Sequence, residues 1–387
     1  MTLTKVSCLT KKGLVIFAAL FIITVLANVF WTNIVEFYYY VLPPKQEINA
    51  VYGLLPPLTF TPKTNLNSDK TEFVLNTKGG NLPLTIPKVI EVYRFQPNTF
   101  SYTAGKDAQN LALILGYTDT ELLTDLRGDV YRWGNFNIKS QLEIKLFTKE
   151  IELTTDLTTP QVREILRNGE ITEEAAIRST DTLLKELNAG SDPLYSTAEK
   201  IATPGKINFN RIQTSTSIRD TQFYRVDYFR TIERNNGKFR ILGPEPKKGN
   251  ISIYTLSGGR NSNSIPPYLA YPIVSVNNST IDRNSVGYYP TISARTAWEA
   301  LLNKNAVLAG IYPEDKSILE EVREAEVERV LINDIYLAYY ENTDPQTYLQ
   351  PIYVFEGNYV GAAGDRGDIF YYVPAIQGQY VTSYTNN

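Results

Sequence analysis

Three carboxylates and one arginine gather near the carboxyl terminus, in a Gly/Ala/Asp-rich segment between two Tyr-rich apolar runs. The stretch from Tyr348 to Ile376 reads YLQPIYVFEGNYVGAAGDRGDIFYYVPAI. Glu356, Asp365 and Asp368 could offer oxygen ligands to Ca²⁺, which takes about six to eight of them. The regular alternation of Asp and Gly found in calcium loops is absent here. The segment NYVGAAGDRGD is therefore interpreted as a solvated loop that joins two strands.

The same segment contains Arg366-Gly367-Asp368, the tripeptide of integrin-type adhesion. A given tripeptide occurs often by chance in a chain of 387 residues. The neighbouring Gly361-Ala362-Ala363-Gly364 is typical of a flexible loop. We therefore assign no adhesive role to the tripeptide.

The amino-acid composition of the chain excludes most other kinds of catalytic and metal-binding site. The chain has no histidine, so it lacks the usual general base and the commonest metal ligand. Its single cysteine, Cys8, excludes an internal disulfide and a Cys-based zinc site. Ser140 follows Lys139 directly, but adjacent strand residues point to opposite faces, which argues against a Ser-Lys pair. No catalytic residue, cofactor or metal ligand is predicted, and we expect the protein not to be an enzyme.

Charge and loop composition also limit the partners. Lys and Arg number 38 and Asp and Glu 41, and a net charge of −3 predicts no nucleic-acid binding. The loops LGPEPKKGN and LSGGRNSNS match neither the P-loop fingerprint nor the dinucleotide-binding fingerprint, so no phosphate-binding loop is predicted. Sequons at Asn250, Asn277 and Asn278 are interpreted as ordinary polar positions. Hydrophobic residues make up 43% of the chain, so most of it is expected to fold, into about two domains.

An apolar run lies close to the amino terminus. From Gly13 to Trp31 the sequence GLVIFAALFIITVLANVFW carries no charge, and as a helix it would span ~29 Å, near the bilayer core of roughly 30 Å. Lysines precede the run and none follows until Lys45, which predicts a cytoplasmic tail (1–12), a transmembrane helix (13–36) and an extracytoplasmic remainder. A cleaved signal peptide is the alternative, but its apolar region is usually shorter. The predicted membrane-interface residues are Lys11, Lys12, Trp31, Tyr38, Tyr39 and Tyr40.

Beyond the run, residues 37–66 are rich in proline and predict an extended stalk. The alternative is that VYGLLPPLTF lies along the first domain as an extended edge.

Short helices and strands then alternate, and two helices share an apolar face at i, i+3, i+4 and i+7. We predict an α+β fold of two tandem helix-plus-antiparallel-sheet modules, 67–203 and 204–378, and a flexible tail, 379–387. Two unrelated α+β domains are the alternative to a duplication. The two helical faces are Ala108, Leu111, Ala112 and Leu115, and Ala294, Ala297, Trp298 and Leu301, with Ser293 as the N-cap of the second.

This helix–strand–strand theme behind one amino-terminal membrane helix resembles the YycI/YycH-type regulatory proteins and the wider PepSY-like group. Tyr288–Gly310 (YYPTISARTAWEALLNKNAVLAG) is similar to the helix that opens such a module. Val330–Asn358 (VLINDIYLAYYENTDPQTYLQPIYVFEGN) is similar to its strands. The likeness is strongest in the second half of the chain and includes no catalytic signature.

The resemblance implies extracytoplasmic domains that contact partner proteins, including the sensor domain of a histidine kinase. We therefore expect a single-pass membrane-anchored binding or regulatory protein that acts by protein–protein contact on a sensor kinase or an envelope enzyme. A structural envelope protein that contacts glycan or peptidoglycan is one alternative. A peptidase-inhibitor-like PepSY module is another.

Tyrosine is the residue that could form such a contact, and the chain has 27 of them. Alternate strand residues point to opposite faces, so some tyrosines of the last strands are expected to face outward. Exposed aromatic side chains are typical of protein interfaces. The predicted partner-contact residues are Tyr336, Tyr339, Tyr340, Tyr348 and Tyr353.

Overall fold

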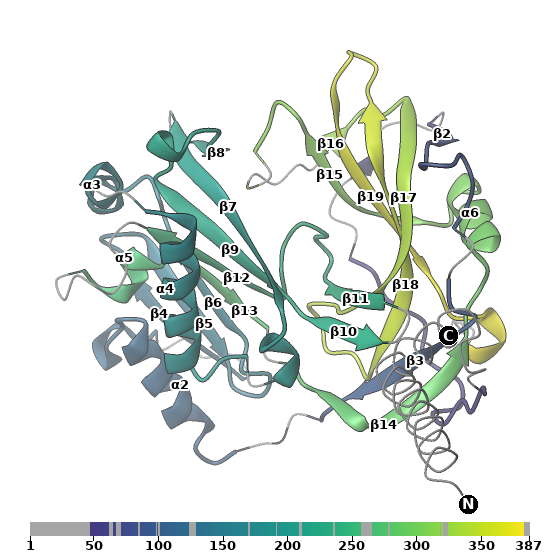
Figure 1. Cartoon of the computed structure of the whole chain (residues 1–387). Coiled ribbons are helices and arrows are strands. Elements are labelled where there is room, and N and C mark those ends of the chain that lie inside the picture. Colours follow the sequence, from purple (N-terminus) through teal and green to yellow (C-terminus); the bar gives the residue numbers. More distant parts are fainter. Residues whose placement is uncertain are drawn as a thin grey trace, which may run out of the picture. The chain divides into compact units, whose positions relative to one another are not determined.

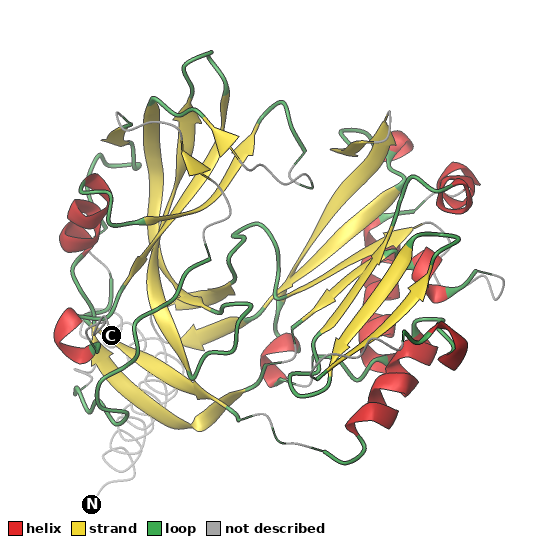
Figure 2. Cartoon of the chain, turned by 180° about the vertical axis from the view of Figure 1, so that it is seen from behind, coloured by secondary structure: helices red, strands yellow, loops and turns green. Residues whose placement is uncertain are grey.

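The structure, a computed structural model, describes residues 47–61, 65–66, 71–83, 86–97, 99, 101–123, 129–168, 171–190, 192–208, 211–234, 237–256, 265–277, 279–317, 319 and 324–382. Strand accounts for 43% of these residues and helix for 20%. Most strands belong to two large sheets (Figure 1, Figure 2). Apart from Arg234 and Gly237, the residues of both sheets lie in one compact unit.

The first large sheet has eight strands in the order β4-β5-β6-β13-β12-β9-β7-β8, and all neighbouring strands are antiparallel. Its strands alternate apolar and polar residues, as in QLEIK and IELTT, so the two faces differ in character. The strands are β4 (Val130–Asn135), β5 (Ser140–Lys145), β6 (Ile151–Thr155), β7 (Glu199–Asn208), β8 (Arg211–Thr214), β9 (Phe223–Phe229), β12 (Ile251–Leu256) and β13 (Ile273–Val276).

Two helices cover one face of this sheet, α2 (Ala104–Ile114) and α4 (Glu173–Glu186) (Figure 1). The α4 helix begins after Thr172, whose side chain accepts a hydrogen bond from the amide of Ala175 at 3.3 Å. Their apolar side chains bury Trp133 completely. The opposite face, which we call the second face, packs at one end with α3 (Pro160–Asn168) through Phe223, Tyr254 and Leu256. The short helix α5 (Pro267–Ala270) and the 3-10 turns η1 (Asp119–Glu121), η2 (Pro193–Tyr195) and η3 (Ile218–Asp220) complete this part.

The second large sheet has nine strands, of which β10-β11-β17-β18-β19-β15 form a continuous path. The long central strands β17 and β18 are rich in Tyr, Ile and Val, which suit a buried pleated surface. The strands are β2 (Glu72–Leu75), β3 (Val89–Phe95), β10 (Thr231–Arg234), β11 (Gly237–Leu242), β14 (Ile281–Pro290), β15 (Val307–Pro313), β17 (Arg329–Tyr340), β18 (Tyr348–Val360) and β19 (Arg366–Pro374). Elsewhere β1 (Asn65–Leu66) pairs with β16 (Glu324–Ala325).

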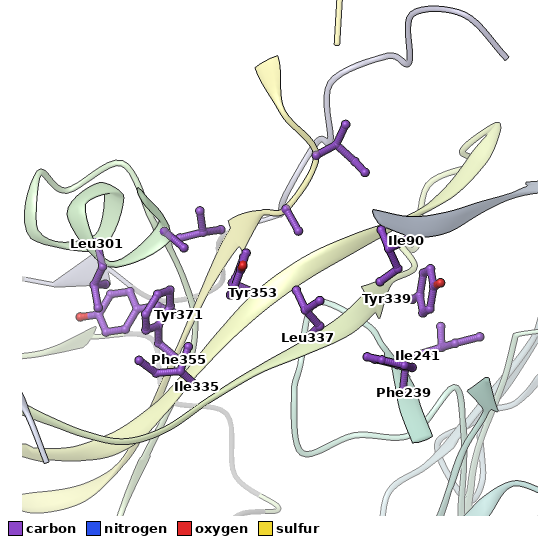
Figure 3. Packing of buried hydrophobic residues seen from close by; sticks show 14 of the residues in the cluster. Ile90, Phe239, Ile241, Leu301, Ile335, Leu337, Tyr339, Tyr353, Phe355 and Tyr371 are labelled. Atoms are coloured by element: carbon purple, nitrogen blue, oxygen red, sulfur yellow. The ribbon is translucent and has the colours of Figure 1, made fainter. Parts of the chain in front are cut away.

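The helix α6 (Ala294–Leu302) packs against this second sheet and contributes Leu301 to the core shown in Figure 3. Ser293 caps it as predicted, by accepting a hydrogen bond from the amide of Thr296 at 3.1 Å. The predicted apolar faces of α2 and α6 are confirmed, although Trp298 is only half-buried, beside Phe355. The turn η5 (Gly378–Tyr380) follows β19.

The chain passes between the two sheets after β3, after β9, after β11 and after β13. As a result β3 pairs with β14 and β18, which lie far along the sequence. The prediction of an α+β fold with two tandem modules is therefore wrong, because the structure is mostly β-sheet. The predicted boundary between residues 203 and 204 falls inside β7. Local patterns identify strands but not their partners, which explains the error.

The predicted stalk and tail also pack in part on the second sheet. In VYGLLPPLTF the amide of Leu55 donates to the carbonyl of Tyr380, and the carbonyl of Leu55 accepts from the amide of Thr382, both at 2.8 Å. The side chain of Gln350 donates to the carbonyl of Pro56 at 2.8 Å. The segment thus lies along the second sheet and not along the first domain, and Tyr380, Val381 and Thr382 of the predicted flexible tail pair with it.

The predicted transmembrane helix (13–36), the tail (1–12) and the membrane-interface residues Lys11, Lys12, Trp31, Tyr38, Tyr39 and Tyr40 lie outside the described residues. Among the helices that are described, none is long and apolar enough to cross a membrane. The prediction of a membrane anchor therefore has no support in the structure.

Candidate functional site

The carboxyl-terminal hairpin differs from the prediction in where its loop lies. Strand β19 begins at Arg366, so the connecting loop is only Gly361–Asp365, and Arg-Gly-Asp lies within a strand. Asp368 is opposite Asn358 on one side and Tyr312 on the other. Its carboxylate accepts hydrogen bonds from Lys247 Nζ at 2.5 Å and Asn358 Nδ2 at 2.9 Å. The tripeptide is thus part of the sheet and not a loop tip.

The three carboxylates of this stretch are not arranged as a metal site. In the part of the chain that the structure describes, no group of three or more Asp, Glu or Cys side chains could hold a metal ion. Glu356 instead lies beside Tyr336, whose hydroxyl donates to Glu356 Oε2 at 3.4 Å. Burial raises the pKa of the Glu356 carboxyl, and the nearby carboxylates of Asp334 and Asp368 raise it further.

The predicted partner-contact tyrosines are mostly core residues. Tyr339, Tyr340 and Tyr353 are 0% exposed, and Tyr336 and Tyr348 are half-buried. Figure 3 shows Tyr339 and Tyr353 among apolar side chains of the second sheet. Burial raises the pKa of Tyr353 to about 12. Tyrosine can be buried when its hydroxyl finds a partner, so three of these side chains cannot contact a protein at the surface of this structure.

The hydrogen bond of one buried tyrosine hydroxyl leads to a prediction about the stability of the protein. Tyr353 donates to the carbonyl of Ile292 at 2.7 Å. We expect Tyr353→Phe to lower the free energy of unfolding by about 1 kcal/mol, because it leaves that carbonyl unpaired. The matched control is Tyr348→Phe, since the Tyr348 hydroxyl has no hydrogen bond with any described residue, and a change below about 0.5 kcal/mol is expected. Urea denaturation measures both, and equal effects would contradict the structural role.

The second face of the eight-stranded sheet carries a continuous line of polar side chains, which we call the polar row. Its members are directly opposite one another on six neighbouring strands, so their side chains share one face. The alternating pattern of each strand shows that one face is polar, but only the register aligns these residues. The polar row consists of Arg132, Glu143, Glu152, Ser275, Ser252 and Asp227, on β4, β5, β6, β13, β12 and β9.

One end of the polar row is buried. Arg225 Nε donates to Asp227 Oδ2 at 2.7 Å, and the two side chains are 6% and 2% exposed. The loop of residues 243–250 covers this pair. The carbonyl of Lys247 accepts from Arg225 Nη2 at 2.7 Å, and the amide of Gly249 donates to Asp227 Oδ1 at 3.1 Å. The charges at this end are therefore satisfied within the protein.

The other end of the polar row is exposed and has an unusual charge arrangement. Glu143 and Glu152 are directly opposite on β5 and β6, which is unfavourable for like charges. Glu143 pairs with Arg132 Nε at 2.9 Å. Glu152 forms no ion pair with a described residue and accepts from Ser275 Oγ at 2.7 Å. The surrounding protein raises the pKa of the Glu152 carboxyl by desolvation, while Lys248 and Ser275 lower it and Glu150 raises it.

Between the two ends lies Ser252, which is 1% exposed. Its Oγ has no hydrogen-bond partner among the described residues. Buried hydroxyls are nearly always paired, so this one is an exception on the second face. Its neighbours in the polar row are Ser275 and Asp227.

A separate buried cluster surrounds Arg230, whose side chain is 0% exposed. Its Nη1 donates to Asp192 Oδ2 at 2.9 Å and to the carbonyl of Ser279 at 2.6 Å. Its Nη2 donates to Glu341 Oε2, which also accepts from Asn250 Nδ2 at 2.8 Å. This cluster has no exposed group and is structural. Asn250 within it is buried, as expected for an ordinary polar position and not for a glycosylation site.

Comparison with known proteins adds little to this geometry. No family model matches the sequence. No curated protein matches it either. One solved structure, that of an uncharacterized protein from Eubacterium rectale ATCC 33656, is 11% identical, with a TM-score of 0.41 over 81% of this chain and 91% of that chain. A likeness at this level supports no inference about function. None of these comparisons supports the resemblance to the YycI/YycH-type or PepSY-like proteins.

Proposed function

We propose that this chain is a binding protein that acts by contacting another protein. The contact surface is the exposed part of the second face, on β4, β5, β6 and β13. The observation that carries the proposal is the asymmetry of the eight-stranded sheet. Helices α2 and α4 bury its first face, while the second face displays polar side chains on neighbouring strands. A regulatory effect on the contacted protein stays a prediction.

The chemistry of this surface suits a protein partner. It carries both signs of charge in a fixed register, and electrostatic complementarity of this kind gives specificity to protein contacts. Aromatic residues are enriched at interfaces, and Phe136 (83% exposed) and Phe147 (41% exposed) lie in the turns before and after β5. The polar side chains of the surface are Arg132, Gln141, Glu143, Lys145, Glu152, Thr154 and Ser275.

A glycan of the cell envelope is the second candidate ligand. Its support is the adjacent hydroxyl and carboxylate groups of Ser275 and Glu152, which could also hydrogen-bond a sugar. Retention of the protein on a peptidoglycan column, lost on mutation of the second face, would favour this candidate over a protein partner.

Site-specific photo-crosslinking in the native cell tests the proposal. A photoreactive side chain at Gln141, which is exposed on β5, is expected to give one reproducible protein adduct. The control position is Glu174, which is exposed on α4. The protein identified at Gln141 is then purified, and its affinity is expected to fall about tenfold with Arg132→Glu but not with Arg178→Glu on α4. No adduct at Gln141, or the same adduct at both positions, would overturn the proposal.

A further inference from the structure

We propose that Glu152, Ser275 and Ser252 form a binding position for the ammonium group of a lysine side chain of the contacted protein. This inference rests on the proposed function and names the chemistry that the second face recognises. The three residues are consecutive members of the polar row, on β6, β13 and β12.

The geometry matches an ammonium group. Neighbouring strands lie about 4.8 Å apart, so three adjacent side chains on one face can converge on a single group between them. An ammonium has three N–H donors and no acceptor. Glu152 and the two serine hydroxyls supply three oxygen acceptors. Ser275 Oγ, which donates to Glu152 Oε1 at 2.7 Å, still has lone pairs to accept with.

The unsatisfied hydroxyl is the observation that distinguishes this position from a plain acidic surface. Ser252 Oγ is buried without a partner in the described part of the chain, on the same face as Ser275 and next to it. A hydroxyl in that state is unfavourable unless a ligand group completes its hydrogen bonding. A donor that enters from the exposed side meets Glu152 and Ser275, and Ser252, which is 1% exposed, lies at the buried end of the position.

Charge selects a cation over the alternatives. Glu152 is opposite Glu143, which is already paired with Arg132, and forms no ion pair of its own among the residues described, although Lys248 and Lys145 act on it from a greater distance and lower its pKa. A bound ammonium removes this like-charge repulsion. A metal ion would lack ligands, since the described residues hold no suitable cluster.

Binding of a defined peptide tests the inference. The probe is a ten-residue peptide of alternating Lys and Gly with blocked ends, and the same peptide with Glu in place of Lys is the control ligand. We expect isothermal titration at low salt to show binding of the Lys peptide only. Its affinity should fall about tenfold with Glu152→Gln and about threefold with Ser252→Ala. Glu164→Gln, which removes an exposed carboxylate on α3, should change it less than twofold.

Each result has a definite reading. Equal affinities for Glu152→Gln and Glu164→Gln would overturn the inference, because the peptide would then respond only to net charge. An unchanged affinity with Ser252→Ala, in a protein that thermal denaturation shows to be folded, would also overturn the inference, because Ser252 is the residue that distinguishes this position from a plain acidic surface. If the adduct at Gln141 forms normally in the Glu152→Gln protein and the peptide affinities are equal, the proposed function stands and this inference fails.

Discussion

Replacement of Arg230 by Met is expected to lower the free energy of unfolding by about 3 to 5 kcal/mol. The guanidinium is completely buried, and its removal leaves the carboxylates of Asp192 and Glu341 without a cation in a site that water does not reach. Breaking a buried pair in this way costs more than the pair contributes, because the remaining charges stay desolvated. Desolvation lowers the pKa of Arg230, but Glu341 and Asp192 more than compensate and the net pKa is raised, so the side chain stays charged.

The position of Arg230 makes the effect large. It lies where the chain leaves β9 for β10, and Asn250 and Ser279 lie at two other passages between the sheets. Arg230 contacts the ring of Tyr195 at 5.1 Å as well. The Arg230 side chain therefore contacts the passage at Ser279 directly and the passage at Asn250 through Glu341, so its loss affects both sheets at once.

Urea denaturation at neutral pH measures the change. Arg132→Met is the matched control, because the Arg132–Glu143 pair is about one-third exposed, and it should cost less than about 1 kcal/mol. The double variant Arg230→Met with Glu341→Gln should recover part of the loss, since one unpaired charge is removed. A loss for Arg230→Met no larger than that for Arg132→Met would show that the cluster does not hold the passages together.

Gly367→Ala is expected to destabilise the protein by about 1 to 3 kcal/mol, the usual cost of overpacking in a close-packed region. A Cβ added at Gly367 would lie 2.1 Å from the carbonyl oxygen of Tyr312 and 2.7 Å from the Cα of Pro313. Both are backbone atoms of the neighbouring strand β15, so a rotamer change cannot relieve the contact. The strands β19 and β15 must separate to accommodate the methyl group.

The control for this change is Gly378→Ala, where an added Cβ meets nothing within 4 Å. Its stability should equal or slightly exceed that of the original chain, because Ala restricts the unfolded state. Thermal denaturation compares the two variants, and equal melting temperatures would refute the close packing. A loss of any adhesive property in an Arg-Gly-Asp variant would then need a folding control, because the glycine is structural.

Short-range features of this fold could be predicted from the sequence. The spacing of Ala108 and Leu115 and of Ala294 and Leu301 identified two helices, because a helical face repeats every 3.6 residues. Ser293 was recognisable as a cap. The alternation in QLEIKLF likewise identified β5. These features depend only on neighbouring residues.

Long-range features could not be predicted, for physical reasons. Nothing local in β3 indicates that it pairs with β14, and the polar row exists only because six strands share one register. Tyrosine also misled the prediction of the contact surface. The ring of tyrosine favours burial and its hydroxyl favours water, so composition alone does not predict whether a given tyrosine side chain is buried or exposed. Tyr339 and Tyr353 are buried because backbone carbonyls accept from their hydroxyls.

The passages of the chain between the sheets also set the order in which the protein can fold during its synthesis. The eight-stranded sheet has all its strands once Val276 has left the ribosome. Strand β3 is synthesised early, but it cannot pair until its partners β14 and β18 have been synthesised. Strand β15 likewise cannot pair until β19 has been synthesised. Unpaired strand edges attract other chains. Nascent chains of this protein are therefore expected to need protection from aggregation until the last strand is made, and chains shortened at the carboxyl end should be insoluble.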